Sequence, residues 1–85
     1  MKYEVLWDAR AEADLAAVWL AATDRHAVTR ASSWFDDQLA RLPLQLGESR
    51  ASSVHRLAFY SPLGIEFEVI EDDKRVVVQA VFAAV

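Results

Sequence analysis

Neither glycine nor proline occurs in this chain before Pro43. Within that span, apolar residues recur at helical spacing in two separate stretches. The first stretch, from Ala9 to Ala22, is rich in alanine, the residue with the highest helix propensity. The second runs from about Arg25 to Leu42 and ends where a proline would remove a helical hydrogen bond. Because only Thr23 and Asp24 separate the two, the sequence predicts an antiparallel helical hairpin.

Each predicted helix has one apolar face. The stripes consist of Ala11, Leu15, Val18, Trp19 and Ala22 in the first helix, and Val28, Ala31, Phe35, Leu39 and Leu42 in the second. Leu20 lies nearly opposite the first stripe, either as a single exposed leucine or as part of an apolar patch for a partner helix. Trp34 lies at the edge of the second stripe, where it either closes the core or anchors a partner. Leu20 and Trp34 are therefore the candidate partner-binding residues.

The remaining regular segments alternate apolar and polar residues, which is typical of strands. They are Lys2 to Trp7, Val54 to Ser61, Ile65 to Ile70 and Arg75 to Phe82, with a loop at 43–53 and turns at Pro62–Gly64 and Glu71–Lys74. The last strand is apolar on both faces and is expected inside the sheet. Strands joined by tight turns pair antiparallel, and a helical hairpin can cover one sheet face. We therefore predict a single α+β domain over residues 1–85, in the order β-α-α-β-β-β, with the hairpin on one face of an antiparallel sheet.

One basic cluster is visible in the sequence. Arg50, His55 and Arg56 lie close together, and Tyr60 is expected to share the open sheet face with Arg56. Arginine binds phosphate oxygens bidentately, and histidine exchanges protons near neutral pH. These four residues are therefore the candidate catalytic groups of a ribonuclease.

A structural interpretation of the same cluster is also open. Arg50 then pairs with Glu48 or a helix end, and Arg56 pairs across the sheet with Glu66 or Glu68. The two glutamates are expected on the open face, where they would repel a phosphate backbone. At an effective dielectric near 20, a like-charge contact at about 4 Å costs about 4 kcal/mol before screening.

Composition excludes several other classes of protein. The 85 residues contain no cysteine, so no disulfide or thiolate chemistry is available, which favours a reducing cytoplasm. Lys2 is followed by Glu4 and Asp8 rather than by an apolar run, so no signal peptide is expected, and no apolar run is long enough to span a membrane. A net charge of −4 opposes binding to a polyanion.

No motif for a cofactor or a metal is present. The sequence has no glycine-rich phosphate loop and no nucleophile motif. His26 and His55 lie far apart, and the acidic run Glu71–Asp73 lacks the spacing of a calcium loop. We therefore expect neither a cofactor nor a metal.

The layout resembles the RelE/ParE family of toxins from bacterial type II toxin–antitoxin modules. The resemblance covers nearly the whole chain and rests on the order and spacing of several landmarks. These are an opening strand, the run Ala13-Asp14-Leu15, the Leu39–Pro43–Gly47 spacing at the end of the second helix, the following Arg50, and a final strand pair around an acidic turn.

The resemblance implies a toxin that is held inactive by a cognate antitoxin, whose segment folds on binding around the helices and the sheet. Leu20 and Trp34 are then candidate contacts. In this family, RelE-like members cut messenger RNA in the ribosome, whereas ParE-like members, including plasmid stabilisation proteins, inhibit DNA gyrase. RelE-like toxins tend to be basic near the C-terminus, but this chain ends in Phe82, Ala83, Ala84 and Val85.

The acidic charge therefore favours a ParE-like toxin that acts by binding a protein. Two alternatives remain: a RelE-like nuclease using Arg50 and Arg56 with His55 or Tyr60, and a degenerate, non-toxic member that serves as a binding or regulatory partner. An unpaired sheet edge would also allow a homodimer.

Overall fold

The computed structural model describes residues 2–49 and 55–84. Its elements are β1 (Glu4–Trp7), α1 (Ala9–Ala21), α2 (Arg25–Arg41), a short 3₁₀ helix (Pro43–Gln45), β2 (Glu48–Ser49), β3 (His55–Tyr60), β4 (Leu63–Ile70), a second 3₁₀ turn (Glu71–Asp73) and β5 (Arg75–Ala83). The predicted helices and strands are confirmed to within a few residues. The two-residue strand β2 lies inside the predicted loop and was not predicted.

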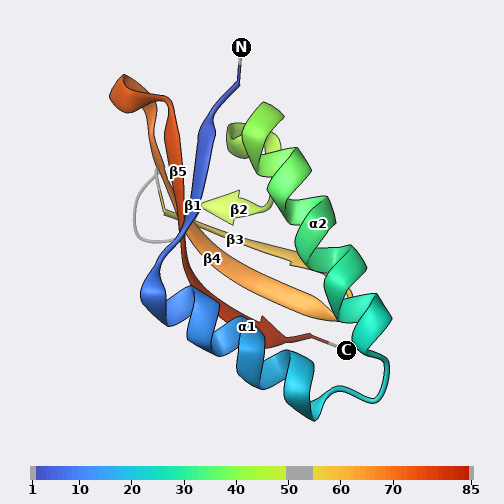
Figure 1. The fold of residues 1–85 in the computed structure, drawn as a ribbon. Helices are drawn as coiled ribbons and strands as arrows, with labels where there is room; N and C mark the ends of the chain where they lie inside the picture. Colours follow the sequence, from blue (N-terminus) through green and yellow to red (C-terminus); the bar gives the residue numbers. More distant parts are fainter. Residues whose placement is uncertain (1, 50–54, 85) are drawn as a thin grey trace.

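The strands form one sheet in the order β1-β5-β4-β3-β2, and both helices cover the same face of it (Figure 1). The predicted helical layer is therefore confirmed, as is the interior position of the last strand. β3, β4 and β5 are antiparallel neighbours, but β1 runs parallel to β5. A purely antiparallel sheet was thus the wrong prediction at this edge. β1 reaches β5 through a long connection that includes both helices, and such a connection allows parallel pairing.

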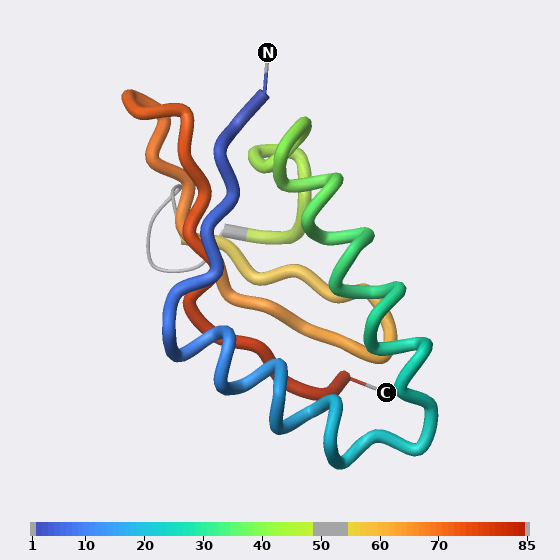
Figure 2. The backbone as a smooth tube through the Cα atoms, in the orientation of Figure 1, coloured from blue at the N-terminus to red at the C-terminus, as the bar shows by residue number. Residues whose placement is uncertain are grey.

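Each helix begins at an aspartate. Asp8 accepts a hydrogen bond from the backbone N–H of Ala11 at 2.9 Å, and Asp24 accepts one from Ala27 at 3.1 Å. These caps satisfy amides that have no partner inside the helix. Arg25 donates to the carbonyl oxygens at the end of α1 and thereby fixes the hairpin. The two helices diverge from this hairpin (Figure 2).

The hydrophobic core lies between the helices and the central strands. Its fully buried large side chains are Val28, Phe35 and Leu39 of α2, Leu63, Ile65, Phe67 and Val69 of β4, and Val76 and Val78 of β5. Leu42 was predicted to continue the α2 stripe, but it is 47% exposed. The helix ends at Arg41, and the chain turns away there because of Pro43. In the described part of the chain, no helix is long and apolar enough to cross a membrane.

β5 contains a β-bulge that the sequence pattern does not reveal. Glu66 of β4 pairs with Ala80, whereas the next residue, Phe67, pairs with Val78. Gln79 is therefore the extra residue. A bulge of this kind interrupts the alternation of side chains along the strand.

The bulge changes which β5 residues face the helices. Val76 and Val78 pack in the core as predicted, but so does Val81, while the pairing places Ala80 and Phe82 on the open face. The prediction that Val76 to Phe82 alternate without a break is therefore wrong beyond Val78.

Candidate functional site

The predicted basic cluster depends on which face of β3 is open. Arg56 pairs with Phe67, and Ala58 pairs with Ile65. Phe67 and Ile65 are buried in the core, so Arg56, Ala58 and Tyr60 face the helix layer. The predicted placement of Arg56 and Tyr60 on the open face is therefore wrong. The small Ala58 packs in the core and is only 1% exposed. The adjacent residues Leu57 and Phe59 therefore face outward.

Arg56 donates hydrogen bonds to two backbone carbonyls. Its Nε donates to the carbonyl of Leu46 at 2.9 Å, and a terminal nitrogen donates to the carbonyl of Gly47 at 2.9 Å. The predicted pairing with Glu66 or Glu68 is not formed, because the two glutamates lie on the opposite face of the sheet. The guanidinium therefore holds the loop that leads into β2.

Tyr60 and Trp34 form a stacked pair between β3 and α2. Their ring centroids lie 4.0 Å apart with an interplanar angle of 7°. Trp34 also contacts Phe35 edge to face at 5.3 Å, so the pair closes one rim of the core. Tyr60 remains 43% exposed. Trp34 as a partner contact remains a prediction, and the exposed ring of Tyr60 would extend that contact.

His55 lies on the open face, apart from Arg56 and Tyr60. Its Nε2 is 3.7 Å from Oε1 of Glu68, and Gln79 donates to the same oxygen at 3.1 Å. Arg50 lies outside the described residues. The structure thus does not bring His55 together with Arg56 and Tyr60, which face the helices.

The open face of the sheet is acidic. Among residues 2–49 and 55–84, its ionisable groups are Glu4, Glu48, Glu66, Glu68, His55 and Arg75. Arg75 pairs with Glu4 at 3.2 Å. Over the same ranges, no group of three histidine, aspartate or glutamate side chains could hold a metal ion. A phosphate backbone would meet mainly carboxylates here.

A groove lies between the two helices, on the side of the molecule opposite the open sheet face. It has a volume of about 490 Å³ and is lined by Glu12, Leu15, Ala16, Trp19 and Leu20 of α1 and by Val28, Thr29 and Ser32 of α2. Leu20 is 64% exposed at its edge. A smaller hollow continues past Trp7 and Asp36, which are joined by a 3.0 Å hydrogen bond. Leu20 therefore belongs to an apolar groove and is not an isolated surface leucine.

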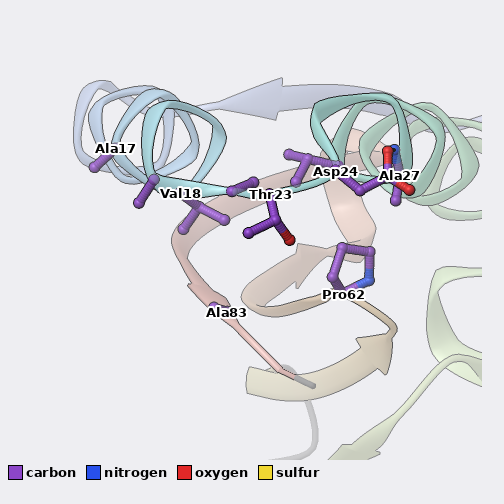
Figure 3. Close-up of a pocket in the computed structure, with 10 residues that line it drawn as sticks. Ala17, Val18, Thr23, Asp24, Ala27, Pro62 and Ala83 are labelled. Carbon is purple, nitrogen blue, oxygen red and sulfur yellow. The ribbon is translucent and has the colours of Figure 1, made fainter.

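A second concavity of about 460 Å³ lies at the hairpin end of the molecule (Figure 3). Methyl groups of α1 and α2 line it, together with Thr23, Pro62 and Ala83. The sequence could not predict this pocket, because it joins the hairpin to the β3–β4 turn and to the end of β5.

A helical hairpin on one face of a mixed sheet, with β1 parallel to the last strand, defines the fold class of the chain. No protein-family model matches the sequence, and no curated protein sequence matches it either. Solved structures do match. One is a chain of the RelBE2 toxin–antitoxin complex of Mycobacterium tuberculosis, at a TM-score of 0.78 and 20% identity, covering 98% of this chain and 99% of that one.

A chain of the chromosomal ParDE toxin–antitoxin system of P. aeruginosa matches at a TM-score of 0.72 and 16% identity, covering 99% of this chain and 98% of that one. A mutant of the E. coli toxin RelE, in complex with a peptide of the antitoxin RelB, matches at a TM-score of 0.71 and 18% identity. The match covers 100% of this chain and 86% of that one. This chain therefore has the fold of the RelE and ParE toxins, as the resemblance implied.

Proposed function

We propose that this chain is the toxin of a type II toxin–antitoxin module, that its helix groove binds the cognate antitoxin, and that it acts on its target by binding a protein. The fold supports the first part, because structures of similar fold include toxins in complex with their antitoxins. The absence of cysteine suits a module that works in the reducing cytoplasm.

The groove supports an amphipathic helix as the antitoxin element. Its floor and edges are apolar at Leu15, Trp19 and Leu20, which suits anchors spaced at i, i+3 or i+4, and i+7. Glu12 lines the groove, and Asp36 lines the hollow that continues it, so basic residues are expected beside the apolar anchors.

The observation that carries the protein-binding proposal is the acidic open face. Within residues 2–49 and 55–84 its carboxylates outnumber its cations, and the sequence-predicted nuclease residues in these ranges do not converge on it. Arg56 holds two backbone carbonyls and Tyr60 stacks on Trp34, both on the helix side. General acid–base groups contribute about 10² to 10⁴ in rate only when they reach the reacting atoms. A ParE-like protein target such as DNA gyrase therefore fits better than ribosome-bound messenger RNA.

The proposal expects a cognate antitoxin to be encoded beside this gene, and binding of that antitoxin tests the groove. Leu20→Asp is expected to raise the dissociation constant at least about tenfold, because it places a charge in an apolar contact. Leu44→Asp is the matched control, since Leu44 is 46% exposed but lies outside the groove. Equal losses for the two variants would contradict a role for the groove.

The mode of action is tested by expressing the chain without its antitoxin. We expect growth arrest with inhibition of gyrase supercoiling by the purified protein, and intact message on translating ribosomes. Cleaved message that disappears in Arg56→Ala would replace this proposal with the RelE-like nuclease. Harmless expression together with tight antitoxin binding would identify a non-toxic binding member instead.

A further inference from the structure

The open face carries an aromatic pair that the hydrophobic core does not use. Phe59 of β3 and Phe82 of β5 meet edge to face, with ring centroids 5.9 Å apart. Both rings lie against Gly64 of β4, where a Cβ atom would come within 2.4 Å of Phe82 Cε2 and 3.0 Å of Phe59 Cδ1. The glycine thus allows two large rings to meet across the middle strand. Phe59 is 59% exposed and is available for contact.

Other apolar side chains extend this pair along the sheet. Leu57 lies on the same face of β3, and Leu6 and Val77 continue the surface on β1 and β5. Leu6 is itself 42% exposed. An apolar surface on an otherwise polar sheet face is typical of an interaction site.

Carboxylates follow the aromatic pair in one direction along the sheet. Glu66 lies between Leu57 and Ala80 in the sheet register, and Glu48 lies on the other side of Leu57. Glu66 has no ion-pair partner among the described residues. Farther along β4, Glu68 is shared by His55 and Gln79. Arg75 is the one arginine that the described residues place on this face, and it is paired with Glu4. The field beside the aromatic pair is therefore negative, and it opposes nucleic acid and attracts a cation.

We infer that this face is a second protein-docking surface, and that it binds a basic segment of a partner protein that places a bulky apolar side chain on Phe59 and Phe82 and a lysine or arginine beside Glu66. The helices cover the opposite face of the sheet, so this surface and the helix groove can be occupied at the same time (Figure 1). The inference rests on the proposed function and deepens it: it assigns the protein-binding role to the open face and the antitoxin to the groove.

The test uses a short synthetic peptide that alternates lysine with phenylalanine and leucine, titrated into the full chain labelled with ¹⁵N. We expect amide shift changes along Leu57, Phe59, Glu66 and Phe82, and weaker binding as ionic strength rises. The same peptide with glutamate in place of lysine should not bind. Shift changes confined to the helix groove, or equal binding of both peptides, would overturn the inference.

Two variants separate a specific site from general attraction to an acidic protein. Phe59→Ser and Glu66→Lys are each expected to weaken peptide binding about tenfold or more. Asp72→Lys makes the same charge change in an exposed turn away from the site and should leave the affinity nearly unchanged. Both sheet-face residues are exposed, so their variants should fold, which the dispersion of the amide spectrum verifies. Equal effects of Glu66→Lys and Asp72→Lys would overturn the inference.

A final titration adds the antitoxin encoded beside this gene before the peptide. Retained peptide binding supports two separate surfaces, whereas displacement of the peptide overturns them. An antitoxin that does not bind at all contradicts the proposed function but leaves the result for the sheet face standing. The two failures are therefore distinguishable.

Discussion

At the level of single residues, the two glycines in the strand-rich half of the chain are required for different structural reasons. Gly47 has a φ of +72°, and a Cβ there would lie 2.2 Å from the carbonyl oxygen of Leu57. Gly64 has an ordinary φ, and its nearest obstacles are ring atoms of Phe82 and Phe59. A side chain can rotate away, but a paired strand backbone cannot move without breaking its ladder.

Gly47→Ala is therefore expected to destabilise the protein by about 2–4 kcal/mol, because it adds a left-handed backbone penalty to a backbone clash. Gly64→Ala should cost clearly less, since the Phe82 ring can be displaced. Urea denaturation of both variants measures the difference. A larger loss for Gly64→Ala would show that the aromatic pair is more rigid than the loop before β2.

A second set of side chains links β1 to the acidic turn. The Tyr3 hydroxyl donates to Glu71 at 2.6 Å, Lys74 also contacts Glu71, and the Lys74 ammonium lies 5.2 Å from the Tyr3 ring centre. The hydrogen bonds from Lys74 and Tyr3 hold the pKa of the Glu71 carboxyl below its ordinary value. The Glu71 carboxylate in turn raises the pKa of Lys74 and of Tyr3.

The pKa of Glu71 is lower in the folded state than in the unfolded state. Its contribution to the free energy of unfolding is therefore complete at pH values above the unfolded pKa of about 4.3, and it is lost as the pH falls through the folded pKa. We expect the melting temperature of the Glu71→Gln variant to fall less steeply with decreasing pH in the acidic range than that of the unmodified protein. The change should be small, because exposed ion pairs contribute little. Lys74→Met should move the pKa of Glu71, followed by carboxyl NMR, back toward its ordinary value; an unchanged pKa would contradict the assigned cause.

At the level of elements, α1 is tied to the sheet beside the β-bulge. Oδ2 of Asp14 accepts a hydrogen bond from the backbone N–H of Val81 at 3.1 Å, and Val81 is 5% exposed. The bulge at Gln79 breaks the regular ladder just before Val81, and the carboxylate on α1 satisfies the Val81 amide from outside the sheet. β1 pairs with β5 only as far as Val78, so a side chain of α1 partners β5 beyond the end of β1.

Asp14→Ala is expected to cost about 1–3 kcal/mol, because it leaves a buried amide without a partner. Asp14→Asn retains an acceptor oxygen and should cost less. Amide exchange at Val81, followed by NMR, should become faster in Asp14→Ala before it does so in the rest of β5. Unchanged protection at Val81 would contradict this role.

The sequence predicts the elements better than it predicts their faces. The helical periodicity and the strand alternation correctly place α1, α2 and the long strands. For β3 the alternation also separates Leu57 and Phe59 from Arg56 and Tyr60 correctly, but it does not say which set turns toward the helices. That choice is made by Ala58, whose small side chain fits under the helix layer.

The same limit applies to β5, which is apolar on both faces. A bulge there exchanges the sheet faces that Ala80 and Val81 occupy, and the hydrophobic pattern of the sequence does not reveal this. The contact between Phe59 and Phe82 could therefore not be predicted, although both residues can be read from the sequence. Leu20 could be proposed as a partner-binding residue from the sequence alone, because finding an apolar residue opposite a helical stripe needs no tertiary information.

At the level of the whole molecule, burial separates the residues that stabilise the fold from those available to partners. Leu39 is 0% exposed and Leu20 is 64% exposed, although both are leucines on helices of the same layer. A domain of this size has a free energy of unfolding of roughly 4–13 kcal/mol. Single core truncations are therefore a large fraction of its total stability.

Leu39→Ala should lower the free energy of unfolding by about 2–5 kcal/mol, because it removes buried methyl groups and leaves a cavity beneath α2. Leu20→Ala deletes the same atoms from the surface and should change stability by less than about 0.5 kcal/mol, while weakening antitoxin binding. Denaturant titration and antitoxin affinity, measured on both variants, separate the two roles. A loss of stability in Leu20→Ala comparable to that in Leu39→Ala would mean that the groove is part of the core and not a surface kept for a partner.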